Sequence, residues 1–433
     1  MKGTHAMREF SIPYGKSSLM LQLPEERIAC VLSAHAREAG APDQETIVRS
    51  ALEHPIGSSR LCELARGKKN ILVITSDHTR PVPSALTLPI LLGEIRSGAP
   101  DAEIRILIAT GMHRATTLEE MNAKFGPELA SCENFIVHRS IEDPMSFKGI
   151  LPSGGELWLN ALVDWADLTV AEGFVEPHFF AGFSGGRKAI LPGIASRKTV
   201  LYNHNAMFIA DPKATTGNLE DNPIHRDMVF AARQAGLKFI LNVLLDGEKR
   251  VIAAYAGDVE KAHKAGCMDC ISRTSVEGTP ADIAITSNGG YPLDQNIYQS
   301  VKGMTAAEAC VRQGSVIIMC AALGDGHGGE AFFRYFADNE NAEEVERAIA
   351  GIPAGETKPD QWQAQILARV MRRARCIFVT GKENRETIEK MHMYWAGNLE
   401  DAMEIADSLI GKNATVAVIP DGVGVVVRGG HET

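Results

Sequence analysis

The chain has 433 residues, a length that favours two domains over a single hydrophobic core. Its formal net charge of −10 argues against a nucleic-acid partner, because such a partner requires a basic surface, but a small anionic ligand can still meet a local cluster of Arg and Lys. With no apolar run of about 18 residues and no signal-peptide pattern at the start, we expect neither a membrane span nor secretion, and therefore a cytoplasmic protein.

Short runs rich in Val and Ile recur along the chain, and each is apolar at both alternating positions. This pattern is typical of strands buried on both faces of a parallel sheet. The predicted strands are 71–75, 104–109, 168–171, 239–245, 283–286, 315–320, 376–380 and 415–419. Helical patterns lie between them, at 84–97, 117–125, 222–235, 258–273 and 398–410. The alternation predicts an α/β protein with mostly parallel sheets.

A polar segment at 274–280 with Gly and Pro suits a linker. We therefore predict an N-terminal α/β domain over 1–273 and a C-terminal α/β domain over 281–433. The last strand could instead return to the first domain.

Polar motifs follow several predicted strands, where ligands of open α/β sheets bind. Asp77 and Arg80 follow the strand at 71–75, and Arg80 suits a carboxylate or phosphate, although a capping Asp with a surface Arg is the alternative. His113 follows the next strand, as a proton-transfer group or as a structural histidine.

The densest motif is His178 to Gly193, in which three glycines surround Ser184 ahead of Arg187 and Lys188. Such a loop presents backbone N–H groups to a phosphate, but it is not a P-loop, because Arg187 precedes the Lys and Ala189 follows it. A Lys in this setting suggests a covalent attachment point or a phosphate clamp. The alternative, a flexible surface loop, leaves the apolar residues of the motif unexplained.

Two further features stay ambiguous on local grounds. His204 suits a transition metal but does not define a metal site alone. The loop 324–329 matches the G-x-G-x-x-G dinucleotide pattern, yet no acid ends a second strand about 20 residues on.

Of the eight cysteines only Cys267 and Cys270 form a C-x-x-C, so we expect reduced cysteines and no zinc site.

In the second domain, a predicted helix beginning near Asp294 places Tyr298 and Lys302 on one face, with Gln299 adjacent. Lys302 is a candidate carboxylate clamp, and a solvated helix face is the alternative reading.

Taken in order, these motifs resemble the nickel-dependent lactate racemase family. The resemblance rests on S-D-x-T-R-P at 76–81, G-x-H-R at 111–114 and H-x-x-x-G-x-S-G-G-R-K at 178–188, followed by His204 and the cluster of Tyr298, Gln299 and Lys302. It extends from about residue 77 to Trp362, and it implies an active site in the cleft between the two domains.

The resemblance implies a nickel pincer nucleotide, pyridinium-3,5-bisthiocarboxylic acid mononucleotide, tethered to Lys188 with His204 as nickel ligand. It implies His113 and His178 as the acid/base pair, with Arg80 orienting the substrate and Asp77 positioning Arg80 or His113. The other implied contacts are Ser184, Gly185, Gly186 and Arg187 for the cofactor, and Tyr298, Gln299, Lys302 and Trp362 for the substrate.

The implied activity is racemisation or epimerisation of a 2-hydroxy acid by reversible hydride transfer, with cofactor biosynthesis proteins as transient partners. The substrate is lactate or a larger, dicarboxylic or sugar acid. Two alternatives are a nicotinamide-dependent oxidoreductase that uses the loop 324–329, and a homologue that binds ligand without turnover.

Overall fold

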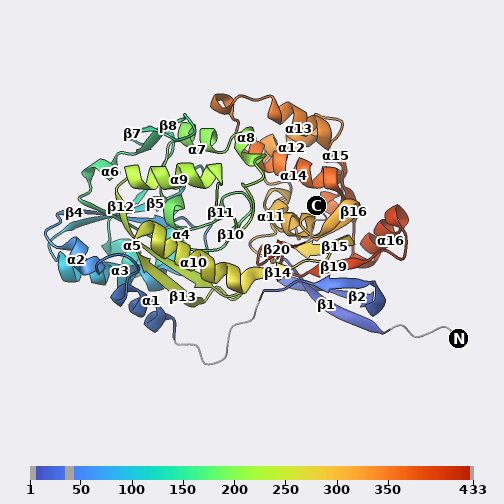
Figure 1. Cartoon of the computed structure of the whole chain (residues 1–433), viewed down its shortest axis with the longest axis horizontal. Helices are drawn as coiled ribbons and strands as arrows, with labels where there is room; N and C mark the ends of the chain where they lie inside the picture. The colour runs from blue at the N-terminus through green and yellow to red at the C-terminus, as the bar shows by residue number, and fades with distance from the viewer. Residues whose placement is uncertain (1–5, 35–42, 430–433) are drawn as a thin grey trace. The chain divides into compact units, whose positions relative to one another are not determined.

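The computed structural model describes residues 6–34 and 43–429, and these contain two six-stranded sheets in two units (Figure 1). The N-terminal unit comprises residues 43–204 and 211–272, and the C-terminal unit comprises residues 6–34, 205–210 and 273–429. The predicted α/β class is confirmed.

The sheet of the N-terminal unit has the strand order β13-β12-β9-β4-β5-β6 and is parallel except at its β13 edge. The predicted strands form because their side chains are buried on both faces, as five consecutive residues of β4 are. The strands are β4 (Asn70–Ser76), β5 (Glu103–Ala109), β6 (Phe135–Val137), β9 (Leu168–Phe174), β12 (Leu237–Leu245) and β13 (Val251–Gly257). Two small antiparallel pairs accompany them, β7 (Met145–Ile150) with β8 (Glu156–Asn160) and β10 (Pro177–His178) with β11 (Gly182–Phe183).

The order of strands creates a switch point between β4 and β9. From β4 the chain moves to β5 and β6 on one side, and it later adds β9 and β12 on the other side. The loops that leave β4 and β9 therefore diverge at the carboxyl ends of neighbouring strands, which opens room for a ligand.

Helices cover the sheet and are bounded by local signals. Asn222 caps α9 by accepting hydrogen bonds from the N–H groups of Ile224 and His225, and Pro223 occupies its first turn. Side chains of α1, α2 and α3 form one core with β4, β5 and β9. The helices are α1 (Gln44–Glu53), α2 (Leu61–Ala65), α3 (Ser84–Gly98), α4 (Leu118–Phe125), α5 (Pro127–Cys132), α6 (Leu162–Trp165), α7 (Arg197–Asn203), α9 (Pro223–Gln234), α10 (Val259–Thr274) and the 3-10 turn η2 (Gly186–Ala189).

The sheet of the C-terminal unit has the order β18-β17-β16-β15-β19-β3, and all its neighbouring strands are parallel. The strands are β3 (Ile28–Val31), β15 (Ala281–Ser287), β16 (Val311–Cys320), β17 (Ala374–Val379), β18 (Tyr394–Ala396) and β19 (Val416–Ile419), with a separate parallel pair of β14 (Ser275–Glu277) and β20 (Val426–Arg428). The helices are α8 (Ala206–Ile209), α11 (Ile297–Glu308), α12 (Glu330–Ala337), α13 (Ala342–Ala350), α14 (Gln361–Arg373), α15 (Arg385–Lys390) and α16 (Leu399–Ile410).

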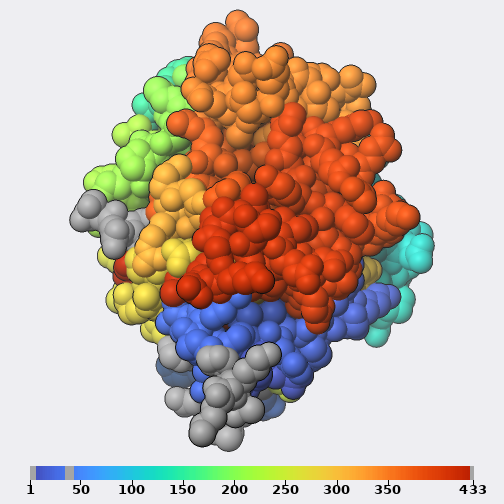
Figure 2. Space-filling view, turned by 90° about the vertical axis from the view of Figure 1, so that its right-hand side faces the viewer, coloured from blue at the N-terminus to red at the C-terminus, as the bar shows by residue number. Residues whose placement is uncertain are grey.

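An antiparallel hairpin of β1 (Met7–Tyr14) and β2 (Ser17–Pro24) packs on this second sheet. Its inward side chains, Phe10, Ile12, Leu21 and Leu23, share a core with β15, β16 and α16. Figure 2 shows the blue N-terminal residues lying directly against the red C-terminal ones. The alternation of inward and outward residues on this hairpin is typical of strands with one covered face.

The structure places the N-terminal strands outside the N-terminal domain that was predicted over 1–273. The structure pairs β3 with β19, so residues 6–34 belong to the C-terminal unit, as do residues 205–210. The last strands, β19 and β20, stay in the C-terminal unit. It is therefore the first strands of the chain, and not the last, that lie outside the unit predicted for them. None of the helices in the described ranges combines the length and the apolar run that crossing a bilayer requires.

Candidate active site

The candidate site of the N-terminal unit lies on the loops that leave β4, β5 and β9. Asp77 and Arg80 follow β4, His113 follows β5, and the segment from His178 to Lys188 follows β9. β4 and β9 flank the switch point of the sheet, and β5 is the other neighbour of β4. The loops that carry the predicted motifs therefore all leave the same edge of the sheet.

Asp77 and His113 form a hydrogen-bonded pair between two of these loops. The Nδ1 atom of His113 lies 2.6 Å from Oδ2 of Asp77, which is 1% exposed. Burial alone would raise the pKa of Asp77, but the hydrogen bond and charge of His113, the charge of Arg80 and the hydroxyl of Thr79 hold that pKa below its ordinary value. The carboxylate is therefore an acceptor at neutral pH, and the Nδ1–H of His113 donates to it. This leaves the Nε2 lone pair of a neutral ring available as a base.

Hydrogen bonds join the His113 loop to the lysine-bearing loop. The N–H of Gly111 donates to the carbonyl of Gly193 at 2.9 Å, and the N–H of Gly193 donates to the carbonyl of Lys188 at 3.1 Å. Gly111 has a φ of +57°, a conformation that residues with a side chain rarely adopt, so a side chain here would strain the turn. The backbone thus fixes His113 relative to Lys188.

The glycines ahead of Lys188 allow the chain to turn inside the protein. Gly185 and Gly186 have φ of +77° and +53°, and a Cβ atom on either would lie 2.7 Å from a neighbouring group, Asn242 or His263. The N–H of Gly186 donates to Oδ1 of Asn242 at 2.8 Å, so this group is already satisfied by the protein. The loop shapes the backbone and presents Lys188 at its end.

The side chains of Ser184 and Arg187 face the interior of the loop. The Ser184 hydroxyl donates to the carbonyl of Phe174 at 3.1 Å and accepts from the N–H of Glu176 at 2.9 Å. Arg187 is 2% exposed, and its guanidinium donates to the carbonyls of Ala181 and Phe183 at 2.6 and 2.7 Å. Both residues therefore support the loop from within, and their contact with a cofactor stays a prediction.

Two buried histidines complete the surroundings of the guanidinium. Nε of Arg187 donates to Nδ1 of His225 at 2.9 Å, and its NH1 lies 3.2 Å from Nε2 of His263. Burial and the charge of Arg187 lower the pKa of His225 to about 3 and lower that of His263 well below its ordinary value. Both rings are neutral at neutral pH. Nδ1 of His225 accepts from the guanidinium, whereas Nε2 of His263 lies 2.8 Å from the carbonyl of Ser184 and donates to it.

The ring of Phe180 brings together three predicted site residues. It lies 4.5 Å from the ring of His178 and 5.1 Å from that of His204, both edge-on, and the Nζ atom of Lys188 lies 5.6 Å from its centre. These side chains come from β10, the end of α7 and η2. An apolar ring packed among these polar side chains excludes water from one side of the group.

His178 and His204 differ in state. The Nδ1 atom of His178 accepts a 3.3 Å hydrogen bond from the N–H of Ala181, an arrangement in which the neutral ring carries its proton on Nε2. His204 is 5% exposed, and burial, with the charge of Lys188, lowers its pKa to about 3. His204 is therefore a neutral imidazole beside the lysine.

Helix α9 holds this group of segments, a role that the sequence analysis missed. Nδ2 of Asn222 donates to the carbonyl of Phe180 at 2.9 Å, His225 accepts from Arg187, and Asp227 accepts from Ser153 and from Nδ2 of Asn203 at 3.3 Å. The one available signal was the polar N-terminal half of an otherwise amphipathic helix.

Four predicted substrate contacts lie in the C-terminal unit. Tyr298, Gln299 and Lys302 are partly exposed on α11, and Trp362 is partly exposed at the start of α14. Nε2 of Gln363 donates to the carbonyl of Tyr298, which ties α14 to the first turn of α11. The location of the active site in a cleft between the domains stays a prediction.

The glycine-rich loop 324–329 serves the same helix. The carbonyls of Gly326 and His327 accept from the N–H groups of Ile297 and Tyr298 at 3.1 and 3.2 Å. A Cβ atom on Gly328 would lie 2.5 Å from the side chain of Asn296. This loop therefore caps α11, and the close approach of Gly328 to Asn296 accounts for one of its glycines.

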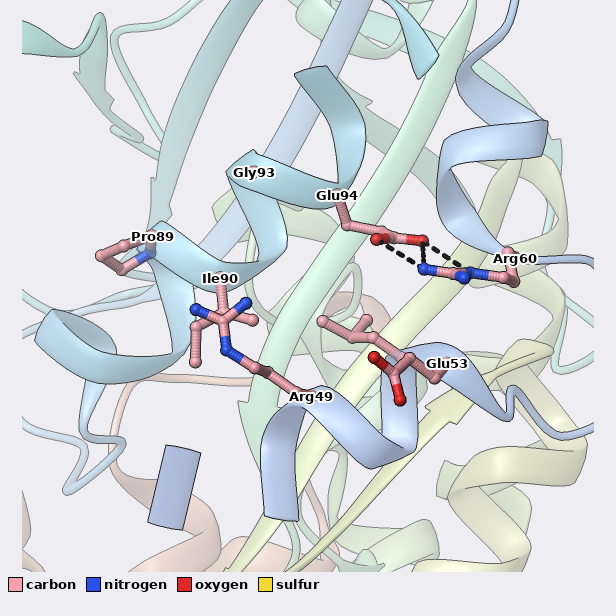
Figure 3. A pocket seen from close by; sticks show the side chains of 8 residues that line it. Arg49, Glu53, Arg60, Pro89, Ile90, Gly93 and Glu94 are labelled. Atoms are coloured by element: carbon pink, nitrogen blue, oxygen red, sulfur yellow. Dashed lines mark hydrogen bonds and ion pairs between the residues drawn. The ribbon is translucent and has the colours of Figure 1, made fainter. Parts of the chain in front are cut away.

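A pocket of about 330 Å³ lies elsewhere in the N-terminal unit, among α1, α3 and the segment before α2 (Figure 3). Its charged lining includes Arg49, Glu53, Arg60 and Glu94, and Arg60 donates to both carboxylate oxygens of Glu94 at 3.0 and 3.1 Å. None of the predicted site residues lines it.

The described residues, 6–34 and 43–429, include every cysteine of the chain. All eight cysteines are free thiols. Within these residues no group of three His, Cys, Asp or Glu side chains is placed to hold a metal ion.

Comparison with known proteins identifies the family. The model of the lactate racemase N-terminal domain matches residues 14–217, and that of the lactate racemase C-terminal domain matches residues 276–427. Lactate racemases of Thermoanaerobacterium thermosaccharolyticum and Lactiplantibacillus plantarum are 54% and 51% identical to this chain, over 98% of it and 100% of each relative.

Solved structures agree with the sequence comparison. The lactate racemase apoprotein of T. thermosaccharolyticum superposes with a TM-score of 0.95 at 54% identity, over 97% of this chain and 100% of that one. A Thermotoga maritima protein, 18% identical with a TM-score of 0.64 over 91% of this chain and 100% of its own, shares the fold alone. The chain belongs to the lactate racemase family, and it is an isomerase.

Proposed function

We propose that this protein racemises lactate with a nickel pincer nucleotide tethered to Lys188, using His113 and His178 as the acid/base pair. The observation that carries the proposal is the convergence of His178, Lys188 and His204 on the ring of Phe180. Backbone hydrogen bonds join this lysine-bearing segment to the loop of His113, which pairs with Asp77. The related proteins of two organisms are named lactate racemases.

The chemistry of the side chains fits the implied group. Within this loop the N–H of Gly186, the guanidinium of Arg187 and the hydroxyl of Ser184 form hydrogen bonds inside the protein, and the primary amine of Lys188 is the nucleophile suited to covalent attachment. His204 is a neutral imidazole close enough to Lys188 to sense its charge, and neutral imidazole is a good ligand for Ni²⁺. Lys188 would hold the nucleotide and His204 its nickel, with Ser184, Gly185, Gly186 and Arg187 supporting the loop.

When bound, the nickel pincer nucleotide supplies an acceptor for the C2 hydride of lactate and a donor for its return. The side chains of this protein manage the proton. Nε2 of His113, with Nδ1–H held by Asp77, takes the hydroxyl proton of one enantiomer while C2 is oxidised to the ketone. His178 serves the other enantiomer, and it takes up a proton once its 3.3 Å bond from Ala181 gives way.

Racemisation requires that the ketone turn its other face while its carboxylate stays held. Arg80 lies on the same loop as Asp77, and its charge lowers the pKa of the carboxylate that pairs with His113. A guanidinium binds a carboxylate through two parallel hydrogen bonds. We propose that Arg80, together with Tyr298, Gln299, Lys302 and Trp362, binds the substrate. Rotation about the bond between C1 and C2 then exchanges the faces.

The substrate class extends by the same reasoning to other small 2-hydroxy acids, because each of these groups addresses only the carboxylate, the hydroxyl and C2. The proteins that synthesise the cofactor are the proposed transient partners.

The experiment is to co-express the chain with a pincer-nucleotide biosynthesis pathway, purify it without oxygen, and measure the mass of the Lys188 peptide, the nickel content and the rate of D/L-lactate interconversion. A mass increase on Lys188, stoichiometric nickel and racemisation are expected. An unmodified Lys188 in a preparation where a known racemase is modified would overturn the cofactor assignment. A modified, nickel-loaded chain that is inert toward lactate would support the cofactor assignment and would overturn lactate as the substrate.

A further inference from the structure

Helix α4 touches both loops that carry His113, Asp77 and Arg80. It begins with a capping box in which Thr117 accepts from the N–H of Glu120 and Glu120 accepts from the N–H of Thr117. Glu120 and Lys124 are four residues apart, so their side chains lie on one face of the helix.

Lys124 binds the loop after β4. Its Nζ atom donates to the carbonyl of Arg80 at 2.9 Å and to that of Val82 at 3.3 Å. This loop contains Pro81 and Pro83, which have no N–H group. The ammonium group donates to two carbonyls of the loop and so holds its backbone at Arg80.

Glu120 binds the loop after β5. It accepts from both terminal nitrogens of Arg114, the neighbour of His113, with one of these bonds at 2.8 Å. The hydrogen bond from Arg114 lowers the pKa of Glu120 to about 2. Burial opposes this shift, and the hydrogen bond from the N–H of Thr117 adds to it. Nε2 of His78, from the loop after β4, lies 3.6 Å from the same carboxylate.

A lysine is an unusual residue for a contact that serves only to stabilise the fold. Burial lowers its pKa to about 8, with the charges of Glu172 and Asp77 opposing and that of Arg80 adding to the shift. A partly buried ammonium whose direct acceptors are carbonyls costs folding free energy that an apolar side chain of the same length would not.

We propose that α4 positions the catalytic loops: Lys124 sets the placement of Arg80, and Glu120 sets that of His113. The two contacts act on different steps, because Arg80 binds the carboxylate and His113 moves the proton. The proposal rests on the roles proposed above for Arg80 and His113.

The test compares Lys124→Met and Glu120→Gln with two matched variants of exposed helical residues, Lys264→Met and Glu119→Gln. Each protein is loaded with the cofactor, and its Lys188 adduct and nickel are measured before kinetics. For Lys124→Met we expect KM for lactate to rise about tenfold or more with kcat changed less than threefold. For Glu120→Gln we expect kcat to fall about tenfold with KM nearly constant. The matched variants should equal the unmutated protein.

Hydrogen exchange of the apoprotein gives a readout that does not depend on turnover. Lys124→Met should speed exchange in residues 77–83, and Glu120→Gln should do so in residues 110–116, with the rest of the sheet unchanged. Lys124→Arg, which keeps the charge and the donors, should restore KM. Equal kinetics in Lys124→Met and Lys264→Met, or a uniform loss of protection, would overturn the proposal. An unmutated, loaded protein without racemase activity would instead refute the proposed function, and exchange would still report on α4.

Discussion

Replacing Asp77 by asparagine tests whether the Asp77–His113 pair sets the base. The carboxylate accepts from Nδ1–H of His113 at 2.6 Å and is 1% exposed. An asparagine of the same shape can turn its NH₂ group toward Nδ1, which then becomes an acceptor and moves the ring proton to Nε2. The lone pair that should take the hydroxyl proton is then lost.

The size of the effect follows from the contact. The contact joins a buried carboxylate to a partly exposed ring, and a hydrogen bond to a charged group is worth about 1.5–3 kcal/mol. If that energy is lost from the transition state, kcat falls by about 10- to 10²-fold, since each 1.36 kcal/mol is tenfold. Nickel content and the Lys188 adduct should not change, because the Asp77 carboxylate is hydrogen-bonded to His113 and Thr79 and not to Lys188 or His204.

The assay is lactate interconversion measured from each enantiomer by chiral chromatography, with the His113 tautomer read by ¹⁵N NMR of the apoprotein. The loss should be larger for the enantiomer whose hydroxyl proton goes to His113. If Asp77→Asn keeps kcat within threefold of the unmutated protein, or shifts the tautomer without affecting kcat, the assignment of His113 as the base is refuted.

The same carboxylate predicts a pH dependence of stability. Because its pKa in the folded protein lies below the ordinary value of 3.8, the carboxylate stabilises the fold above that value, and this stability is lost as pH falls below it. Urea unfolding of the apoprotein should therefore show a shallower acid loss for Asp77→Asn between about pH 4 and pH 2. An identical acid slope in both proteins would contradict this sign.

Three further substitutions separate the roles of the remaining residues. His204→Ala should lower nickel content while keeping the Lys188 adduct, as measured by metal analysis and peptide mass; undiminished nickel would refute the ligand assignment. His178→Ala should abolish racemisation with nickel retained, and near-normal turnover would sink the two-histidine mechanism. Arg187→Met should destabilise the apoprotein by about 3–5 kcal/mol in urea unfolding, because it leaves buried carbonyls without donors; a loss below about 1 kcal/mol would show that water replaces the guanidinium.

Local sequence determined the regular elements of the sheets. Strands β4, β5, β9 and β12 lie where apolar residues occupy both alternating positions, because burial on both faces imposes that pattern. The hairpin of β1 and β2 was not predicted. It covers only one face of a sheet, and its short alternation is a weaker signal.

The candidate residues of the site were also readable in the sequence, since parallel strands end at a common edge and the polar motifs follow them. Their partners were not. The proton on His113 is set by Asp77, 36 positions away, and Arg187 is enclosed by His225 and His263, 38 and 76 positions away. These pairings depend on strand order and helix packing, which no local pattern encodes.

The chain by itself therefore determined the main strands and helices of the two sheets and the candidate residues for the chemistry, because burial and residue type act locally. The tertiary structure decided that β3 joins the second sheet, that Arg187 supports the lysine loop from inside, and that α4 and α9 hold the loops. The physical reason is that hydrogen bonds and burial between distant segments exist only once the strands have been placed side by side.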